Sequence, residues 1–313
     1  MIVENFVTLF NNIFLPQGLA LHFSMERHMR NYLLWILCVD DETYYVMEKL
    51  ALPNIRLLKL SNLENKELLS VKSERSIAEY CWTLSSFAPR YVFEADKSVK
   101  RVTYVDADLW FIKQPRSIFD EFEKSGKQVL ITEHAYAPKY DQSEKFGKFC
   151  VQFMTFTRNG GESVRKCWEK QCLEWCFSRV EDGKFGDQKY LDDWPERFSS
   201  LVHVLNNKGS ALAPWNATLF SYNDAIFYHF HGLKIISKKK LQIGSYSLPI
   251  SLRQNVYRPY SKDLKNAINL LDSIKFSWCT QAKTPSILKR FYYLARYMLG
   301  ISQTLFPFNY IKW

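Results

Sequence analysis

The sequence predicts an α/β fold in which a mostly parallel sheet is flanked by helices. Strand-like and helix-like segments alternate from residue 2 to residue 132, which is typical of strands joined by helical crossovers. The chain of 313 residues is long enough to bury a full core, and 47% of its residues are hydrophobic. Two aspartates, Asp106 and Asp108, follow an apolar, β-rich run, and ligands of such sheets bind beyond the strand ends.

Local signals place the elements of residues 1–132. Pro16 lies at the start of the helical pattern of residues 15–29, where proline is favoured. Asp40 and Asp41 are favoured N-caps for the helix that ends near residue 50, and Pro89 bends or ends the helix that begins at residue 73. The expected strands cover residues 2–10, 32–39, 55–60, 128–132 and the run before Asp106. The expected helices cover residues 15–29, 40–50, 73–93 and 115–124.

The pattern changes to shorter strands after residue 149. We expect strands at residues 151–157, 202–205 and 225–230, and one helix at residues 161–179. We find no internal repeat and no low-complexity linker. Residues 1–233 are therefore expected to form one domain, with halves at 1–132 and 133–233, and residues 234–313 a basic, helical C-terminal appendage.

The net charge of +10 arises from the residues of that appendage. From Lys234 onward lie 14 of the 42 Lys and Arg residues but only 2 of the 32 Asp and Glu residues. This distribution argues against nucleic acid as a partner of the body and favours a tail that meets an anionic membrane surface. Residues 286–299 place apolar side chains at helical spacing among basic ones, as in helices that lie in a headgroup region. A helix packed on the body explains the same pattern.

The cysteines predict the compartment. The number of cysteines, seven, is odd, and their spacing is not that of a zinc site. No hydrophobic signal segment precedes them, and no apolar run is long enough to span a bilayer. We expect reduced thiols in a cytoplasmic protein. The basic tail, if it meets the membrane, would place the protein on the inner face of the cell membrane.

The two aspartates indicate a metal site. A pair one residue apart, just past a strand end, can converge on one hard cation such as Mn²⁺ or Mg²⁺ and leave positions open for substrate phosphates. The competing interpretation is a chance pair, but two unpaired carboxylates in an apolar region would be costly. His229 also follows a β-rich run, and a neutral imidazole can complete a Mn²⁺ site, although such a histidine is often only a packed core residue.

Taken together, the motifs resemble a known group. They are the Val-Asp-Ala-Asp strand end, the upstream Lys72 and Arg75, the pair Asp187-Gln188, and His229-Phe230-His231-Gly232. In this order they resemble the retaining GT-A glycosyltransferases of family 8 and related bacterial surface-polysaccharide glycosyltransferases. The resemblance covers about residues 2–234.

The resemblance implies a GT-A fold and a role for each matching residue. Asp106, Asp108 and His229 would hold the metal, and Asp106 would also touch the ribose. Thr8, Phe10, Asn11 and Arg75 would contact the nucleotide or its phosphates, with Lys234 as a further phosphate contact. Asp187 would bind sugar hydroxyls, and Gln188 would lie beside the anomeric carbon. The implied donor is a nucleoside diphosphate sugar, a UDP-sugar in particular, and the acceptor a glycan or lipid-linked glycan.

The chain departs from that family at two places. Leu233-Lys234-Ile235 replaces the Lys-Pro-Trp that follows the histidine motif, and Val151-Gln152-Phe153 replaces the Asn-x-Gly of the central strand. Trp215 is a candidate for an aromatic wall. Two other functions compete with sugar transfer: a nucleotidyltransferase acting on sugar phosphates, and a non-catalytic protein that binds sugar nucleotides.

Overall fold

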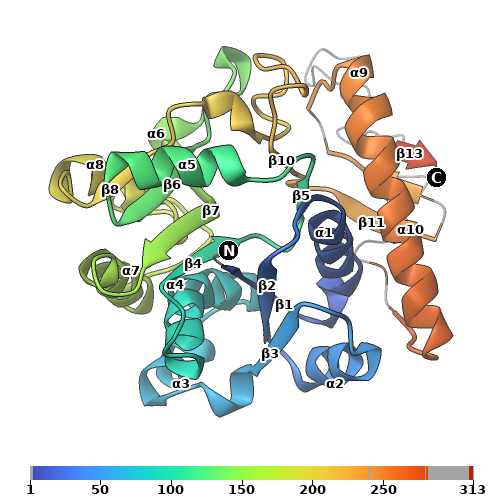
Figure 1. The fold of residues 1–313 in the computed structure, drawn as a ribbon, viewed down its shortest axis with the longest axis horizontal. Coiled ribbons are helices and arrows are strands. Elements are labelled where there is room, and N and C mark those ends of the chain that lie inside the picture. Colours follow the sequence, from blue (N-terminus) through green and yellow to red (C-terminus); the bar gives the residue numbers. More distant parts are fainter. Residues whose placement is uncertain (1–2, 239, 245, 279, 281–309, 313) are drawn as a thin grey trace.

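A seven-stranded sheet forms the centre of the molecule (Figure 1). The computed structural model describes residues 3–238, 240–244, 246–278, 280 and 310–312. The strand order is β3-β2-β1-β4-β7-β6-β8, and neighbours are parallel except where β7 pairs with β4 and β6. The strands are β1 (Glu4–Phe10), β2 (Tyr32–Cys38), β3 (Ile55–Lys59), β4 (Arg101–Val105), β6 (Val129–Glu133), β7 (Phe149–Thr157) and β8 (Val202–Val204). The mostly parallel sheet expected from the sequence is confirmed.

Helices cover both faces of this sheet (Figure 1). Side chains alternate along β1, so Phe6 packs with α1 and α5, whereas Val7 packs with α4 and α7. This alternation buries one apolar cluster on each face. The helices are α1 (Leu15–His28), α2 (Asp41–Leu50), α3 (Lys66–Lys72), α4 (Ile77–Ala95), α5 (Arg116–Ser125), α6 (Ser143–Phe146), α7 (Glu162–Glu174), α8 (Trp194–Arg197), α9 (Ile250–Leu252) and α10 (Arg258–Ser273).

The helix predicted at residues 73–93 has different ends. Ser76 and Glu79 form a capping box that starts α4 at Ile77, and α3 is a separate helix before it. Pro89 lies inside α4, which continues to Ala95. The prediction missed the cap because a helical pattern also covers the residues before it.

The helix predicted at residues 161–179 is too long. α7 ends at Glu174, and Trp175 takes an extended conformation. The Trp175 carbonyl then accepts a hydrogen bond from the Tyr190 hydroxyl at 2.7 Å, which holds the chain away from the helix axis. The aromatic residues after α7 therefore belong to a loop.

A small sheet completes the edge at which the candidate site lies. It consists of β5 (Leu109–Phe111), β10 (Phe227–His229) and β9 (Ala211–Leu212), with β10 antiparallel to β5 and parallel to β9. The chain turns from β4 into β5 through Asp106, Ala107 and Asp108. This turn places the residues after β4 directly beside the end of β10.

The residues after Lys234 that the structure describes contact the body. β11 (Lys234–Ser237), β12 (Lys240–Gln242) and β13 (Tyr310–Lys312) form an antiparallel sheet, and α10 packs along α1 (Figure 1). Asp263 of α10 accepts hydrogen bonds from Trp110 Nε1 at 2.8 Å and from the guanidinium of Arg27. The division at residue 233 stays a prediction. The tail segment 286–299 lies outside the described residues.

Two bulk properties complete the description. Among the described residues, no helix is long and apolar enough to cross a membrane. The six cysteines that the structure describes are all free thiols.

Candidate functional site

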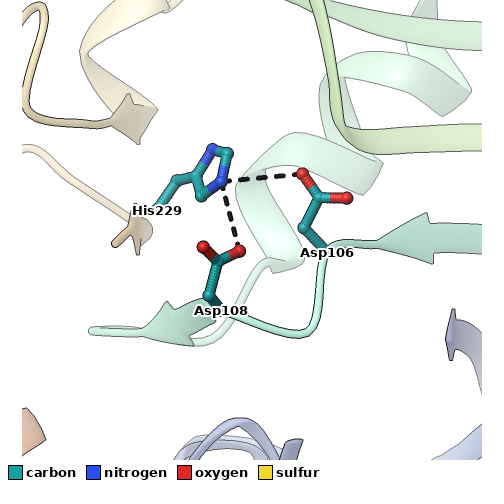
Figure 2. Close-up of side chains that lie close together, drawn as sticks. All are labelled: Asp106, Asp108 and His229. Carbon is teal, nitrogen blue, oxygen red and sulfur yellow. Dashed lines mark ion pairs between the residues drawn. The ribbon is translucent and has the colours of Figure 1, made fainter. Parts of the chain in front are cut away.

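The three predicted metal ligands converge at the junction of β4, β5 and β10 (Figure 2). His229 Nε2 lies 3.2 Å from Asp108 Oδ1 and 3.6 Å from Asp106 Oδ2. One ligand atom from each residue lies within 4.8 Å of the others. The backbone fixes this arrangement, because His229 pairs with Leu109 across the two strands and the Phe230 amide donates to the Asp108 carbonyl at 3.0 Å.

Gln152 connects the two sides of this cluster. Its backbone carbonyl accepts a hydrogen bond from the Asp106 amide at 3.2 Å, and its side-chain Oε1 lies 2.8 Å from His229 Nδ1. An amide oxygen can only accept, so Nδ1 carries the proton and donates. Nε2 is thereby left facing the two carboxylates, which is the orientation that a metal-binding imidazole needs.

The ionisable groups of the cluster influence one another strongly. Burial raises the pKa of Asp106 to about 6, against the attraction of His229. Burial would also raise the pKa of Asp108, but the charge and hydrogen bond of His229 outweigh it and lower that pKa. Burial opposes the charge on His229 in turn, yet the two carboxylates raise its pKa well above the ordinary value. Without a bound cation, a protonated His229 therefore compensates the aspartates.

The cluster forms one wall of a cavity of about 690 Å³. Seven of the predicted site residues line this cavity: Phe10, Asn11, Asp106, Asp108, Asp187, Gln188 and His229. Aromatic rings make up much of the remaining wall, including those of Trp82, Phe146, Phe185 and Trp215. A cavity of this size can enclose much of a small organic ligand.

Asp187 is a buried carboxyl group on a separate part of the wall. Its side chain accepts a hydrogen bond from Ser85 Oγ at 2.6 Å, and its carbonyl accepts one from Trp168 Nε1 at 2.8 Å. Burial raises its pKa to about 7, which Ser85 opposes and the Asp106 charge reinforces. Next to it, Gln188 Nε2 donates to the Phe146 carbonyl at 2.7 Å. Asp187 therefore changes protonation near neutral pH.

Three predicted site residues lie away from the cavity wall. Thr8 is fully buried in β1, behind the residues that line the cavity. Arg75 is buried between α3 and α4, where its guanidinium donates to Thr83 and to the Leu173 carbonyl. Lys234 is exposed on β11. The geometry gives Arg75 a packing role between helices and gives no support to a nucleotide contact by any of the three.

Sequence reasoning assigned no role to Gln152 and His134, which the structure brings to the site together with Trp215, the candidate for an aromatic wall. Gln152 could have been noticed as the one amide side chain in the largely apolar strand β7. Trp215 is surrounded by three imidazoles, with ring centroids 5.1 Å from His134 and 5.4 Å from both His229 and His231. No local pattern links His134 to this group, because β6 ends just before it and the other rings come from distant segments.

Comparisons with known proteins give relatives in sequence and in fold. No family model matches the chain. It is 30% identical to the uncharacterized protein YfnF of Bacillus subtilis over 247 residues, which cover 73% of this chain and 81% of YfnF. It is 28% identical to the uncharacterized protein YfnD of the same organism over 268 residues, covering 80% of this chain and 85% of YfnD.

Solved glycosyltransferases share the fold. The galactosyltransferase LgtC aligns over 84% of this chain and 96% of its own, with a TM-score of 0.53 and 12% identity. Mouse xyloside xylosyltransferase 1 aligns over 74% and 98%, with a TM-score of 0.50 and 15% identity. GlyE of Streptococcus pneumoniae aligns over 90% and 66%, with a TM-score of 0.50 and 14% identity. At these identities the likeness establishes the GT-A fold, as expected from the sequence.

Proposed function

The chain belongs to the same family as YfnF, and we propose that it is a metal-dependent glycosyltransferase that moves a sugar from a nucleoside diphosphate sugar to an acceptor hydroxyl. The observation that carries this proposal is the convergence of Asp106, Asp108 and His229 on the wall of a cavity. The fold alone would not suffice, because one fold hosts many activities.

The three side chains fit a divalent cation. Two carboxylate oxygens and one imidazole nitrogen are ligands that suit Mn²⁺, and Mg²⁺ accepts the oxygens. Ligand atoms at right angles around such an ion lie about 3 Å apart, given metal–ligand distances of about 2.1 Å. The separations of 3.2 and 3.6 Å from His229 Nε2 are close to that value. Bound there, the metal would neutralise charge on the departing diphosphate.

The remaining residues would position the substrates. Phe10 and Asn11, at the end of β1, would contact the nucleotide, and Asp106 would also reach the ribose. Asp187 would bind sugar hydroxyls, and Gln188 would lie beside the anomeric carbon. With a pKa of about 7, Asp187 can donate a hydrogen bond to a sugar oxygen when protonated. If transfer inverts the anomeric centre, Asp187 is instead the candidate general base.

The finer parts of the proposal rest on the resemblance described above. We propose retention of configuration, a UDP-sugar as donor and Mn²⁺ or Mg²⁺ as the ion. The acceptor would be a glycan or lipid-linked glycan in surface polysaccharide or lipopolysaccharide synthesis. The protein would act in the cytoplasm, with its basic C-terminal residues against the membrane and without a nucleic-acid partner.

Hydrolysis of a panel of sugar nucleotides tests the proposal. The purified full chain is incubated with each compound and Mn²⁺, and then with EDTA. We expect slow release of one nucleoside diphosphate that EDTA abolishes, and that product would name the donor. Binding without any release, with or without a glycan acceptor, would support the non-catalytic alternative. Pyrophosphate formed from a nucleoside triphosphate and a sugar phosphate would support a nucleotidyltransferase.

A further inference from the structure

The described part of the cavity wall carries three carboxyl groups and no lysine or arginine. Asp106, Asp108 and Asp187 line it, whereas none of the described residues that line it is a lysine or arginine. The basic groups on this wall are the imidazoles of His134, His229 and His231. Two of the carboxylates are already engaged with His229. An additional anion near Asp187 would therefore find no lysine or arginine among the described lining residues, and the His229 imidazole is already engaged with two carboxylates.

The surroundings of Asp187 show how a carboxylate in this part of the cavity is stabilised or destabilised. It is only 3% exposed, and its side chain has the Ser85 hydroxyl as partner rather than a cation. The charge that acts on it most is the like charge of Asp106, and together with burial this raises its pKa. A carboxylate on a ligand would meet the same surroundings, and the ionised form of Asp187 would repel it in addition.

Aromatic rings stand beside Asp187 and Gln188. The centroid of Phe185 lies 4.5 Å from that of Phe146 and 6.0 Å from that of Trp82. A Cβ at Gly186 would lie 3.4 Å from the Trp82 ring, which is van der Waals contact, so the backbone just before Asp187 lies beside this ring. Such rings offer apolar faces, and the adjacent Asp187 and Gln188 offer hydrogen bonds. This combination suits a pyranose, which has an apolar C–H face and a rim of hydroxyls.

We infer that the sugar bound against Asp187 and Gln188 is a neutral pyranose and that acidic sugars, such as uronic acids, are rejected. The inference rests on the proposed function, because it assigns the ligand of the proposed sugar subsite. The preference would arise because no described lysine or arginine on the wall can pair with a sugar carboxylate. Burying an unpaired charge costs free energy, which would weaken binding of an acidic sugar.

Matched pairs of sugar nucleotides test the inference by binding. Calorimetry with Mn²⁺ first identifies which of UDP, GDP, ADP and dTDP binds the full chain. The corresponding glucose and glucuronic acid derivatives are then compared, as are the galactose and galacturonic acid derivatives. We expect each acidic sugar to bind at least about tenfold more weakly than its neutral counterpart. Equal or tighter binding of the acidic member would overturn the inference and leave the glycosyltransferase proposal intact. Failure of all four diphosphates to bind would contradict the proposed function itself.

Two variants of one residue separate charge from packing. Trp82→Gln removes the ring without adding charge, and Trp82→Lys removes it and adds a cation. We expect the glutamine variant to weaken both members of a pair alike, and the lysine variant to restore binding of the acidic sugar at least about tenfold relative to it. Unchanged affinity for the free diphosphate shows that each variant is folded. Equal behaviour of the two variants would mean that charge does not set the preference.

Discussion

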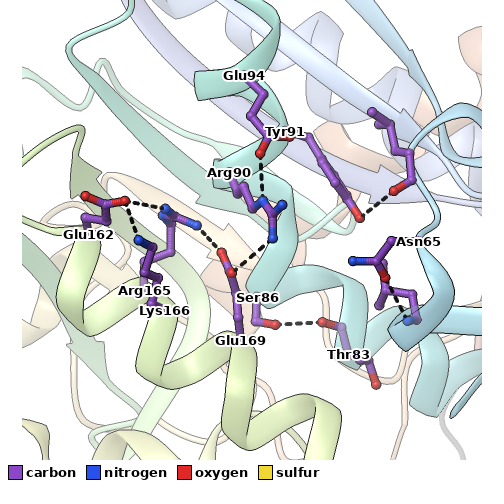
Figure 3. Close-up of polar contacts among 12 residues, drawn as sticks. Asn65, Thr83, Ser86, Arg90, Tyr91, Glu94, Glu162, Arg165, Lys166 and Glu169 are labelled. Carbon is purple, nitrogen blue, oxygen red and sulfur yellow. Dashed lines mark hydrogen bonds and ion pairs between the residues drawn. The ribbon is translucent and has the colours of Figure 1, made fainter. Parts of the chain in front are cut away.

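Two clusters of charged side chains in this molecule differ in how their charges are balanced. Between α4 and α7, Arg90, Arg165 and Lys166 pair with Glu94, Glu162 and Glu169, so three cations meet three anions (Figure 3). At the cavity, two aspartates share one histidine. The charges of the first cluster balance within the protein, whereas in the second two carboxylates face one imidazole, which is the imbalance that the proposed metal ion would correct.

The difference separates a structural role from a binding role. Glu169 is buried, accepts a hydrogen bond from Arg165 of α7 and forms an ion pair with Arg90 of α4 at 3.7 Å, so it joins the two helices. Asp106 and Asp108 keep side chains 22% and 20% exposed toward the cavity. Ionisable groups that are buried, crowded and still open to a cavity are typical of functional sites, while balanced ion pairs between helices are typical of packing.

The largest expected effect is at Asp108. Asp108→Asn keeps the shape of the side chain but removes the charge that a metal needs. We expect metal-dependent turnover to fall by about a thousandfold or more, with Mn²⁺ binding lost and little change in melting temperature. Calorimetric titration with Mn²⁺ and a hydrolysis assay measure both. Glu94→Gln is the matched control, because it neutralises a carboxylate of the balanced cluster and should leave Mn²⁺ affinity unchanged. Retained metal-dependent transfer in Asp108→Asn would refute the site.

Glu169 should show the opposite behaviour. Glu169→Gln leaves the buried Arg165 without its closest carboxylate, and breaking such a pair costs about 3 kcal/mol or more. We expect the free energy of unfolding in urea to fall by that amount, while the folded protein binds Mn²⁺ as before. A variant that loses metal binding without losing stability would show that the two clusters are not separate.

A smaller effect is expected at Gln152, which positions His229. Gln152→Leu removes the acceptor for Nδ1–H, and losing a partner of this kind weakens metal binding by about 10- to 100-fold. Gln152→Glu keeps an acceptor and should retain the affinity. Nitrogen NMR of His229 with Mg²⁺ bound should show a proton on Nδ1 in the wild type and in Gln152→Glu. Equal affinity in all three proteins would remove Gln152 from the site.

The smallest effect concerns stability against pH. Burial raises the pKa of Asp187 from 3.8 to about 7, so the folded state binds more protons than the unfolded state between those values. The contribution of Asp187 to the free energy of unfolding should therefore fall as pH rises from about 4 to about 7, and should stay constant above. Because Asp187→Asn cannot titrate, the wild-type free energy of unfolding minus that of the variant should fall by about 1 kcal/mol or more over this range. Parallel curves measured in EDTA would contradict the assigned protonation.

Local patterns predicted much of the fold and part of the site. The alternation of periodicities located the strands of the large sheet, and the spacing of Asp106 and Asp108 after β4 marked a site. The ends of α4 and α7 were wrong because they depend on a capping box and on the Trp175 contacts. Gln152 and His134 were missed because their roles come from pairing between distant strands, which no local spacing encodes. The nucleotide contact of Arg75 was carried over from the family resemblance and stays a prediction, while the structure shows its guanidinium donating to Thr83 and to the Leu173 carbonyl.

The most direct test of the central claim is a crystal structure grown with Mn²⁺ and a nucleoside diphosphate. Anomalous scattering at the manganese edge identifies the ion and locates it directly. The account predicts one anomalous peak bonded to Asp106, Asp108 and His229 Nε2, with a phosphate oxygen also bound to the ion. A nucleotide seated in the cavity without manganese at this position, or manganese held by other residues, would contradict it.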